Sequence, residues 1–442
     1  MKKKNKGFTL VELLGVLIIL ALIAFIAIRA IRGSINTAKQ GLDEKTEKEI
    51  LDAAEKWSIE NSDRFDDTEA TIQQVGLNIV FVVDVSGSMK SNLANDNTAN
   101  PWTNSRYKAT ADAIQAALTT LKENPLNKVS FVFYSGMVRS GTSGCSASSS
   151  GTFTSTCSLR YQTALADVTS IGNVTSSDGY IKVGSQSVAV SGGTYTQLGV
   201  LKARDILVSG PDRNSQIPVV ILLTDGAPTV GRTTLEVGDG NLGNGTETNN
   251  KLGQIGQYLI QSLIKTKQDL SSAYGGSTVF MYTIGLGVNH AFGKFVLDPR
   301  IDNLSLISTG CPASSTTNNY NTEWARCELY RIYAKDNGSQ YNGVITKSFT
   351  GTMSEDELRT NFISIAHDVQ EATKITQVCV SVEELAREGY LSKSDIKLTD
   401  GTSYSDTFVI ASFNEATNQY AYAIARTDEQ ISTCRALASN NN

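Results

Sequence analysis

An apolar run near the N-terminus constrains this chain more than any other feature of its sequence. The run extends from Phe8 to Ile28 and contains a single charged residue, Glu12. A helix of roughly 20 apolar residues spans the hydrocarbon core of a membrane. Four lysines precede the run, and basic residues favour the cytoplasmic side of a membrane. We therefore expect residues 8–28 to form a transmembrane helix that places the rest of the chain outside the cytoplasm.

The residues at the start of this run are more specific than its hydropathy. Gly7 and Phe8 follow a short basic leader, and Glu12 lies inside the apolar run. The string Gly-Phe-Thr-Leu-Val-Glu resembles the N-terminal motif of type IV prepilins. The resemblance implies that a prepilin peptidase cleaves after Gly7, that the amine of Phe8 is methylated, and that Glu12 faces the amine of a neighbouring pilin. A carboxylate in a membrane needs a partner, which agrees with this role.

The resemblance also implies a location and partners. Residues 1–7 are the expected cleaved leader, and residues 8–62 are the expected N-terminal pilin helix. The subunit is expected in the cytoplasmic membrane before assembly, and then in an extracellular pilus on the cell surface with other pilins. A generic signal anchor is the alternative, but it does not explain Gly7, Phe8 and Glu12 at this spacing.

The middle of the chain alternates apolar runs with amphipathic patterns. Continuous apolar runs, typical of strands that are buried on both faces of a parallel sheet, occur at 77–84, 128–135, 217–225 and 277–287. Helical patterns occur at 106–121, 198–207 and 252–270. This alternation predicts an α/β fold with a doubly wound, mainly parallel sheet.

Oxygen-bearing side chains follow two of these strands and precede one helix. In doubly wound folds, ligands bind at the carboxyl edge of the sheet, where such positions meet. The candidate residues are Asp84, Ser86, Ser88, Thr194 and Asp225. Two carboxylates and three hydroxyls form an all-oxygen set, which suits a hard divalent cation rather than zinc.

This set resembles the metal-ion-dependent adhesion site of von Willebrand factor A domains, and the likeness covers residues 76–374. It implies that Ser86, Ser88 and Thr194 coordinate the cation directly when ligand is bound, with Thr196 as a nearby alternative to Thr194. It also implies that the two carboxylates act mostly through water, and that an extracellular protein ligand supplies a carboxylate. Magnesium is the expected cation, with manganese and calcium as alternatives. A last strand at 330–336 and a last helix at 354–370 are expected.

The C-terminal part resembles a pilin again. The strings VEELAREGYL (382–391), FVIASF (408–413) and QYAYAIA (419–425) resemble the sheet-bearing half of a pilin globular domain. The factor A domain is therefore expected to be inserted into an α+β pilin fold, between residues 8–62 and the pilin sheet region at 375–442.

Six cysteines are present, and none form a C-x-x-C pair that would favour a zinc ribbon. An exported chain with an even number of cysteines favours disulfides. In chain order, the neighbouring pairs are Cys145 with Cys157, Cys311 with Cys327 and Cys379 with Cys434. Other pairings stay open, because sequence does not fix connectivity.

Charge and composition exclude some functions. The formal net charge of -5 gives no basic footprint for nucleic acid, and the sequence has only two histidines. No serine-histidine-aspartate, cysteine-histidine or zinc signature predicts an enzyme. We therefore expect a minor pilin that acts as a surface adhesin. The alternatives are a structural tip or priming pilin, or a secretion-system pseudopilin, whose factor A domain organises other subunits.

Overall fold

The computed structural model describes the chain in segments. They are residues 43–65, 71–95, 97–136, 154–211, 213, 216–243, 249–275, 277–288, 296–297, 343–392, 403–404, 407–414 and 419–439. Within these segments, no helix is both long and apolar enough to cross a membrane. Outside them lie the expected leader, the transmembrane helix, the strand at 330–336, Gly7, Phe8, Glu12, Cys145, Cys311 and Cys327.

The chain divides into two compact units. Unit 1 contains Met1–Gln73 and Ile375–Asn442, and unit 2 contains Gln74–Lys374 between them. The residues that the sequence suggests for the inserted domain, 76–374, lie within unit 2.

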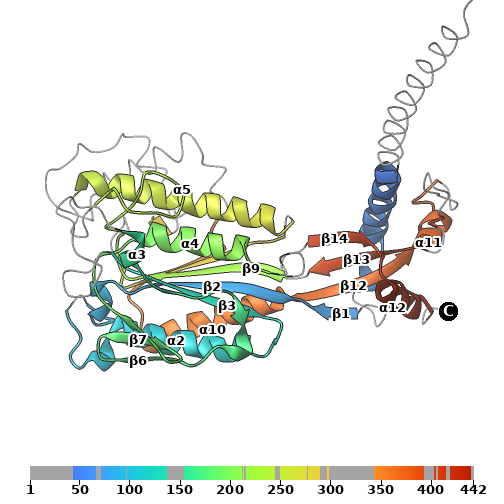
Figure 1. The fold of residues 1–442 in the computed structure, drawn as a ribbon. Coiled ribbons are helices and arrows are strands. Elements are labelled where there is room, and N and C mark those ends of the chain that lie inside the picture. Colours follow the sequence, from blue (N-terminus) through green and yellow to red (C-terminus); the bar gives the residue numbers. More distant parts are fainter. Residues whose placement is uncertain are drawn as a thin grey trace, which may run out of the picture. The chain divides into compact units, whose positions relative to one another are not determined.

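Unit 2 is built on a seven-stranded sheet (Figure 1). The strands are ordered β11-β10-β9-β2-β3-β4, and β5 also pairs with β3. Their bounds are β2 (Gly76–Asp84), β3 (Lys128–Tyr134), β4 (Leu159–Gln162), β5 (Ala166–Asp167), β9 (Gln216–Thr224), β10 (Phe280–Leu286) and β11 (Lys347–Gly351). Neighbours from β11 to β3 run parallel, whereas β4 and β5 run antiparallel to β3. The prediction of a mainly parallel sheet is confirmed.

The burial of the central strand β2 shows that both faces of the sheet are covered. All nine of its residues are buried. Successive side chains of a strand point to opposite faces, so Ile79 and Phe81 enter one core cluster, whereas Val80 and Val82 enter the other. A continuous apolar run is therefore required here, because neither face meets water.

Four long helices cover these faces, two on each (Figure 1). One face packs against α2 (Arg106–Leu121) and α10 (Glu355–Glu371), and the other packs against α4 (Thr196–Val208) and α5 (Asn249–Ala273). The helix α10 begins with a capping box in which Ser354 and Glu357 bond to each other's backbone N–H. The four helices lie close to the positions that the sequence predicts.

Smaller elements of unit 2 were not predicted from the sequence. A three-stranded antiparallel sheet packs against α2, and its strands are β6 (Val174–Ser177), β7 (Tyr180–Val183) and β8 (Gln186–Ala189). The polar edge strand β11 was also missed. Short helices in the loops are η2 (Gly87–Lys90), η3 (Trp102–Asn104), α3 (Ser155–Ser158) and η4 (Val168–Ser170).

Unit 1 contains a four-stranded sheet and a long helix that packs on it. Residues 43–60 are helical. The sheet has the order β1-β12-β13-β14, with β1 (Thr71–Gln74), β12 (Lys374–Ser381), β13 (Phe408–Asn414) and β14 (Gln419–Ile424). The apolar side of the helix, including Ala54 and Trp57, packs on Val378 and Val409 of the sheet. The remaining helices are η1 (Ser62–Phe65), α11 (Val382–Arg387) and α12 (Asp428–Ser439).

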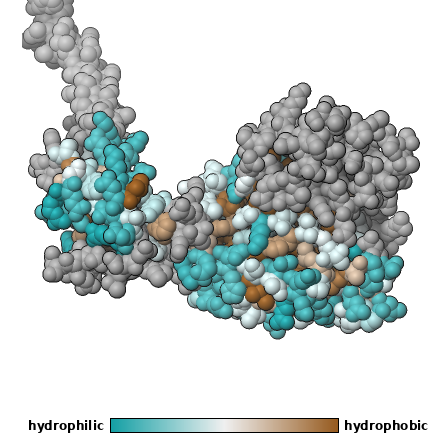
Figure 2. Space-filling model, turned by 180° about the vertical axis from the view of Figure 1, so that it is seen from behind, coloured by the Kyte–Doolittle hydropathy of each residue, from teal (hydrophilic) through white to brown (hydrophobic). Residues whose placement is uncertain are grey.

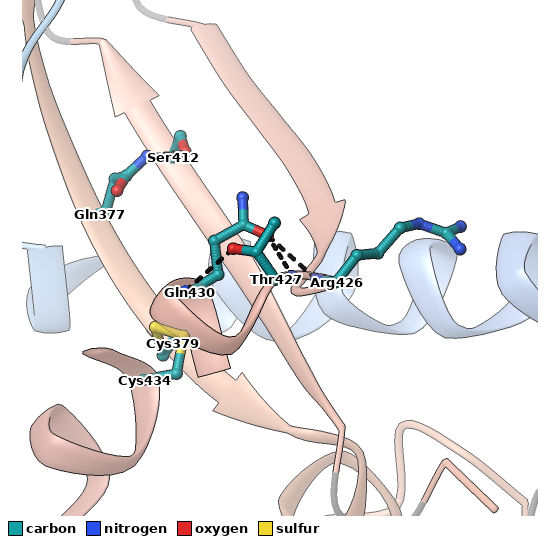
Figure 3. The surroundings of a disulfide bond; sticks show 7 residues. All are labelled: Gln377, Cys379, Ser412, Arg426, Thr427, Gln430 and Cys434. Carbon is teal, nitrogen blue, oxygen red and sulfur yellow. Dashed lines mark hydrogen bonds between the residues drawn. A yellow bond between two sulfur atoms is a disulfide. The ribbon is translucent and has the colours of Figure 1, made fainter. Parts of the chain in front are cut away.

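The C-terminal helix α12 is held to the sheet by a disulfide. Cys379 of β12 bonds to Cys434 of α12 with an S–S distance of 2.03 Å (Figure 3), and this is one of the neighbouring pairs that the sequence suggested. Thr427 Oγ1 accepts a hydrogen bond from Gln430 N, while Gln430 Oε1 accepts one from Thr427 N, so a reciprocal pair starts the helix. Cys157 of unit 2 is also disulfide-bonded.

Candidate metal centre

The loops at the carboxyl edge of the unit 2 sheet are joined by backbone hydrogen bonds. Val85 N donates to Tyr134 O and Ser191 N donates to Val85 O, both over 2.8 Å. Gly87 N donates to Gly192 O over 2.8 Å. These bonds bring the loop after β2 and the segment before α4 together, although Gly87 and Gly192 are 105 positions apart in the sequence.

Asp84 is the last residue of β2 and has 0% of its surface exposed. Its Oδ1 atom accepts a hydrogen bond from Ser86 N over 2.8 Å. Its Oδ2 atom accepts one from Thr224 Oγ1, at the end of β9, over 2.6 Å. The Asp84 carboxylate is therefore fixed between the ends of two neighbouring parallel strands.

The next three candidate residues form a continuous chain of oxygen atoms. Ser86 Oγ lies 3.0 Å from Ser88 Oγ. Ser88 Oγ donates to Asp225 Oδ1 over 2.8 Å. The structure thus brings Asp84, Ser86, Ser88 and Asp225 together at one edge of the sheet.

Thr194 lies in the segment before α4, and its backbone is held firmly. Thr194 O accepts hydrogen bonds from Thr229 N and Val230 N, and Thr194 N donates to Thr229 Oγ1. Thr196, the nearby alternative, is fully buried as the first residue of α4 and accepts a bond from Tyr134 OH over 3.4 Å. The Thr196 hydroxyl is therefore engaged beneath the edge, which favours Thr194 as the candidate hydroxyl.

Arg106 is a component of this centre that sequence reasoning missed. Its Nη1 atom donates to Asp225 Oδ2 over 2.9 Å. Its other nitrogens donate to backbone carbonyls of the preceding loop, Nε to Asn92 O over 3.1 Å and Nη2 to Asn95 O over 3.3 Å. The only signal in the sequence was indirect, because two buried carboxylates need a nearby cation and Arg106 opens the next helix.

Burial controls the protonation of both carboxylates. Burial first and the neighbouring Asp225 charge second raise the pKa of Asp84 to about 7, although hydrogen bonds from Thr224 and Ser86 act in the opposite direction. Burial also raises the pKa of Asp225, although Arg106 and Ser88 lower it. When both carboxylates ionise, Arg106 balances only one of the two charges. The remaining negative charge is the kind that a bound cation compensates.

The donor chemistry of the centre fits a hard divalent cation. Carboxylate and hydroxyl oxygens are the ligands that magnesium and calcium prefer. Across the described segments, no three or more histidine, cysteine, aspartate or glutamate side chains cluster together. At the candidate centre, the described residues offer two carboxylates, Asp84 and Asp225, together with hydroxyl groups.

The surface of the described residues is mainly polar. Among them, the exposed large hydrophobic side chains are Ile59, Leu126 and Tyr180. In the view of Figure 2, hydrophobic residues lie among hydrophilic ones on the face of unit 2, several of them next to atoms drawn in grey.

Comparison with known families identifies the N-terminal segment. Residues 2–28 match the family model for the prokaryotic N-terminal methylation motif. The chain thus carries the methylation motif of type IV prepilins. No curated protein matches the chain significantly.

Solved structures with distant similarity include two pilus proteins and a pilus tip domain. The PilB minor pilin from Streptococcus sanguinis is 14% identical over 67% of this chain and 62% of its own, with a TM-score of 0.40. The pilus adhesin SpaC from Lactobacillus rhamnosus GG is 16% identical over 70% of this chain and 32% of its own, with a TM-score of 0.37. The vWF domain of the type V pili tip protein Mfa5 from Porphyromonas gingivalis is 13% identical over 67% of this chain and 96% of its own, with a TM-score of 0.31. The matched region thus covers less than two thirds of the PilB and SpaC chains.

Proposed function

We propose that this chain is a minor type IV pilin that acts as a surface adhesin, and that unit 2 binds an acidic protein ligand through a divalent cation. The observation that carries the proposal is the hydrogen-bonded cluster of Asp84, Ser86, Ser88 and Asp225 at the carboxyl edge of a parallel sheet. The methylation motif at residues 2–28 supports the pilin part of the proposal.

The residues of the centre have distinct proposed roles. The hydroxyls of Ser86, Ser88 and Thr194 would hold the cation, and Asp84 and Asp225 would balance its charge, mostly through water. The bound cation would supply an electropositive centre with an open position for a ligand carboxylate. Thr224 and the Ser86 N–H hold Asp84 in one orientation, so the centre needs little rearrangement to bind.

The position of the centre within unit 2 supports a role in external binding. The chain enters unit 2 just before β2 and leaves it after α10, where Val75 N donates to Thr373 O over 3.1 Å. The candidate centre lies at the opposite end of β2, and the nine residues of this strand span roughly 30 Å. The connections to unit 1 are therefore far from the centre within this unit.

An adhesion assay separates an adhesin from a scaffold. Cells that display the parent chain, Asp84→Ala or the exposed control Asp356→Ala would be counted on protein-coated surfaces, with pili counted in parallel. An adhesin predicts that Asp84→Ala and a chelator both abolish adhesion while pilus number is unchanged, and that added magnesium restores the parent. A structural tip or priming pilin, or a pseudopilin, predicts instead that Asp84→Ala reduces the number or length of filaments. Cation-independent adhesion by Asp84→Ala would contradict the metal-bridge mechanism.

A further inference from the structure

Arg160 of β4 occupies an irregular position in the sheet. Leu159 pairs with Tyr134 and Tyr161 pairs with Phe133, so Arg160 has no opposite residue on β3. Leu159 packs in the core cluster beneath α4 and α5, whereas Tyr161 packs in the cluster beneath α2 and α10. In a regular strand these two residues would face the same side. Arg160 is therefore the extra residue of a β-bulge, a feature that redirects a side chain.

The redirected guanidinium is held by neutral groups at the carboxyl edge. Arg160 Nε donates to Ser135 Oγ over 2.8 Å. Arg160 Nη2 donates to Ser191 Oγ over 2.7 Å and to Ser191 O over 3.2 Å. Ser135 directly follows β3, and Ser191 lies in the segment that leads to Thr194. Three donors of the guanidinium are thus used, and its orientation is fixed.

No carboxylate among the described residues pairs with the positive charge of Arg160. Within the described part of the chain, no carboxylate accepts a hydrogen bond from Arg160, and its Nη1 atom makes no hydrogen bond. The buried arginines among the described residues of unit 2 differ, because Arg106 pairs with Asp225 and Arg204 pairs with Glu236. Burial lowers the pKa of Arg160, which nevertheless stays charged. A partly buried charge is stabilised when an anion pairs with it.

Arg160 lies beside the candidate metal centre. Ser191, which it contacts, is three residues from Thr194, and three residues span at most about 11 Å. Gly136 N also donates to Gly193 O. A Cβ on Gly136 would lie 2.8 Å from Gly193 Cα, so the two loops are in direct backbone contact. These contacts keep Arg160 and Thr194 at the same edge of the sheet.

We infer that Arg160 forms a second anion subsite, and that the ligand presents two acidic side chains, one to the cation and one to Arg160 Nη1. The inference rests on the proposed cation-dependent function and extends it to the chemistry of the ligand. An arginine with two free N–H groups on one nitrogen recognises a carboxylate by charge-assisted hydrogen bonds. A ligand with one acidic group would occupy only one of these two subsites.

Peptides test the inference with the full-length chain in magnesium. The probe is acetyl-Glu-Gly-Gly-Glu-amide, because its two acidic residues are separated by a span similar to that between Ser191 and Thr194. Two matched peptides replace either glutamate by glutamine. We expect the parent chain to bind the doubly acidic peptide about tenfold or more tightly than either singly acidic peptide, as charged hydrogen bonds allow.

Variants assign this preference to Arg160. Arg160→Gln should bind all three peptides about equally and should retain magnesium-dependent binding, whereas Arg160→Lys should keep part of the preference. Arg359→Gln removes an exposed arginine of α10 and should behave like the parent. Equal binding of the three peptides by the parent overturns the inference alone, as does an unchanged preference in Arg160→Gln. Absence of magnesium-dependent binding for every peptide overturns the proposed function and this inference with it.

Discussion

Arg106 Nη1 lies 2.9 Å from Asp225 Oδ2, and the two side chains are 2% and 0% exposed. This buried ion pair sits inside the candidate metal centre and ties it to the backbone of the loop at Asn92 and Asn95. Arg106 therefore acts as an internal cation, which balances part of the carboxylate charge before any metal binds.

Replacing this internal cation should make unit 2 depend on added metal. Arg106→Gln leaves Asp225 buried without its charged partner, and breaking a buried pair costs about 3–5 kcal/mol of unfolding free energy. We expect the variant to unfold at lower temperature than the parent in chelator, and to gain more stability from magnesium. Thermal unfolding with chelator and with magnesium measures both effects, and Arg359→Gln is the matched control. Equal stability of Arg106→Gln and the parent in chelator would show that the ion pair has no such role.

The raised carboxylate pKa values predict that pH and cation binding are linked. The pKa of Asp84 is raised to about 7, so the folded cation-free chain holds a proton that the unfolded chain loses at lower pH. The free energy of unfolding of the cation-free chain should therefore fall as pH rises from 3.8, the ordinary aspartate pKa, to about 7. Cation binding requires ionised carboxylates, so magnesium affinity should increase between about pH 5.5 and about pH 8. Calorimetric titrations at both pH values test this, and a pH-independent affinity would exclude Asp84 as the linked group.

Much of the candidate centre could be predicted, because its two carboxylates lie where two recognisable strands end. Continuous apolar runs identify strands that are buried on both faces, and the carboxyl ends of parallel strands share one edge. Asp84 and Asp225 therefore had to lie near each other once their strands were recognised. The observed β2 and β9 end at Asp84 and Thr224, close to the expected boundaries.

The contributions of Arg106 and Arg160 could not be predicted in this way. Arg106 is the first residue of α2, and its hydrogen bond to Asp225 depends on how α2 packs against the sheet. Arg160 acts because of a bulge, and a bulge depends on the pairing register rather than on the residue itself. The small sheet of β6, β7 and β8 was missed because its strands are short and polar, for example VTSS in β6.

The disulfide of unit 1 should stabilise that unit without affecting the metal centre. Cys379 and Cys434 are separated by 55 residues, and closing such a loop contributes about 4 kcal/mol in the chain-entropy model. The double variant Cys379→Ser with Cys434→Ser should lower the stability of unit 1 to denaturant. Its magnesium affinity should match the parent, because unit 2 contains the whole candidate centre. Loss of magnesium binding in this variant would contradict that separation.

The methylation motif predicts the mature N-terminus. Cleavage after Gly7 should give a chain that begins with methylated Phe8, and mass spectrometry of protein sheared from cells measures this directly. A chain that begins at Met1 or beyond Arg29 would contradict processing at this motif.

Glu12→Ala should still enter the membrane, since it makes the helix more apolar, but it should enter filaments poorly.

The proposed function requires that Asp84, Ser86, Ser88, Thr194 and Asp225 bind a divalent cation. Titration of magnesium into the cation-free full-length chain, followed by calorimetry, tests it most directly. We predict that one magnesium binds per parent chain, and that the exposed control Asp356→Ala behaves in the same way. Asp84→Ala should bind about 10- to 100-fold more weakly, the usual effect of losing a group that supports a metal ligand set. A parent chain that binds no divalent cation, or an Asp84→Ala variant that binds it as tightly as the parent, would contradict the claim.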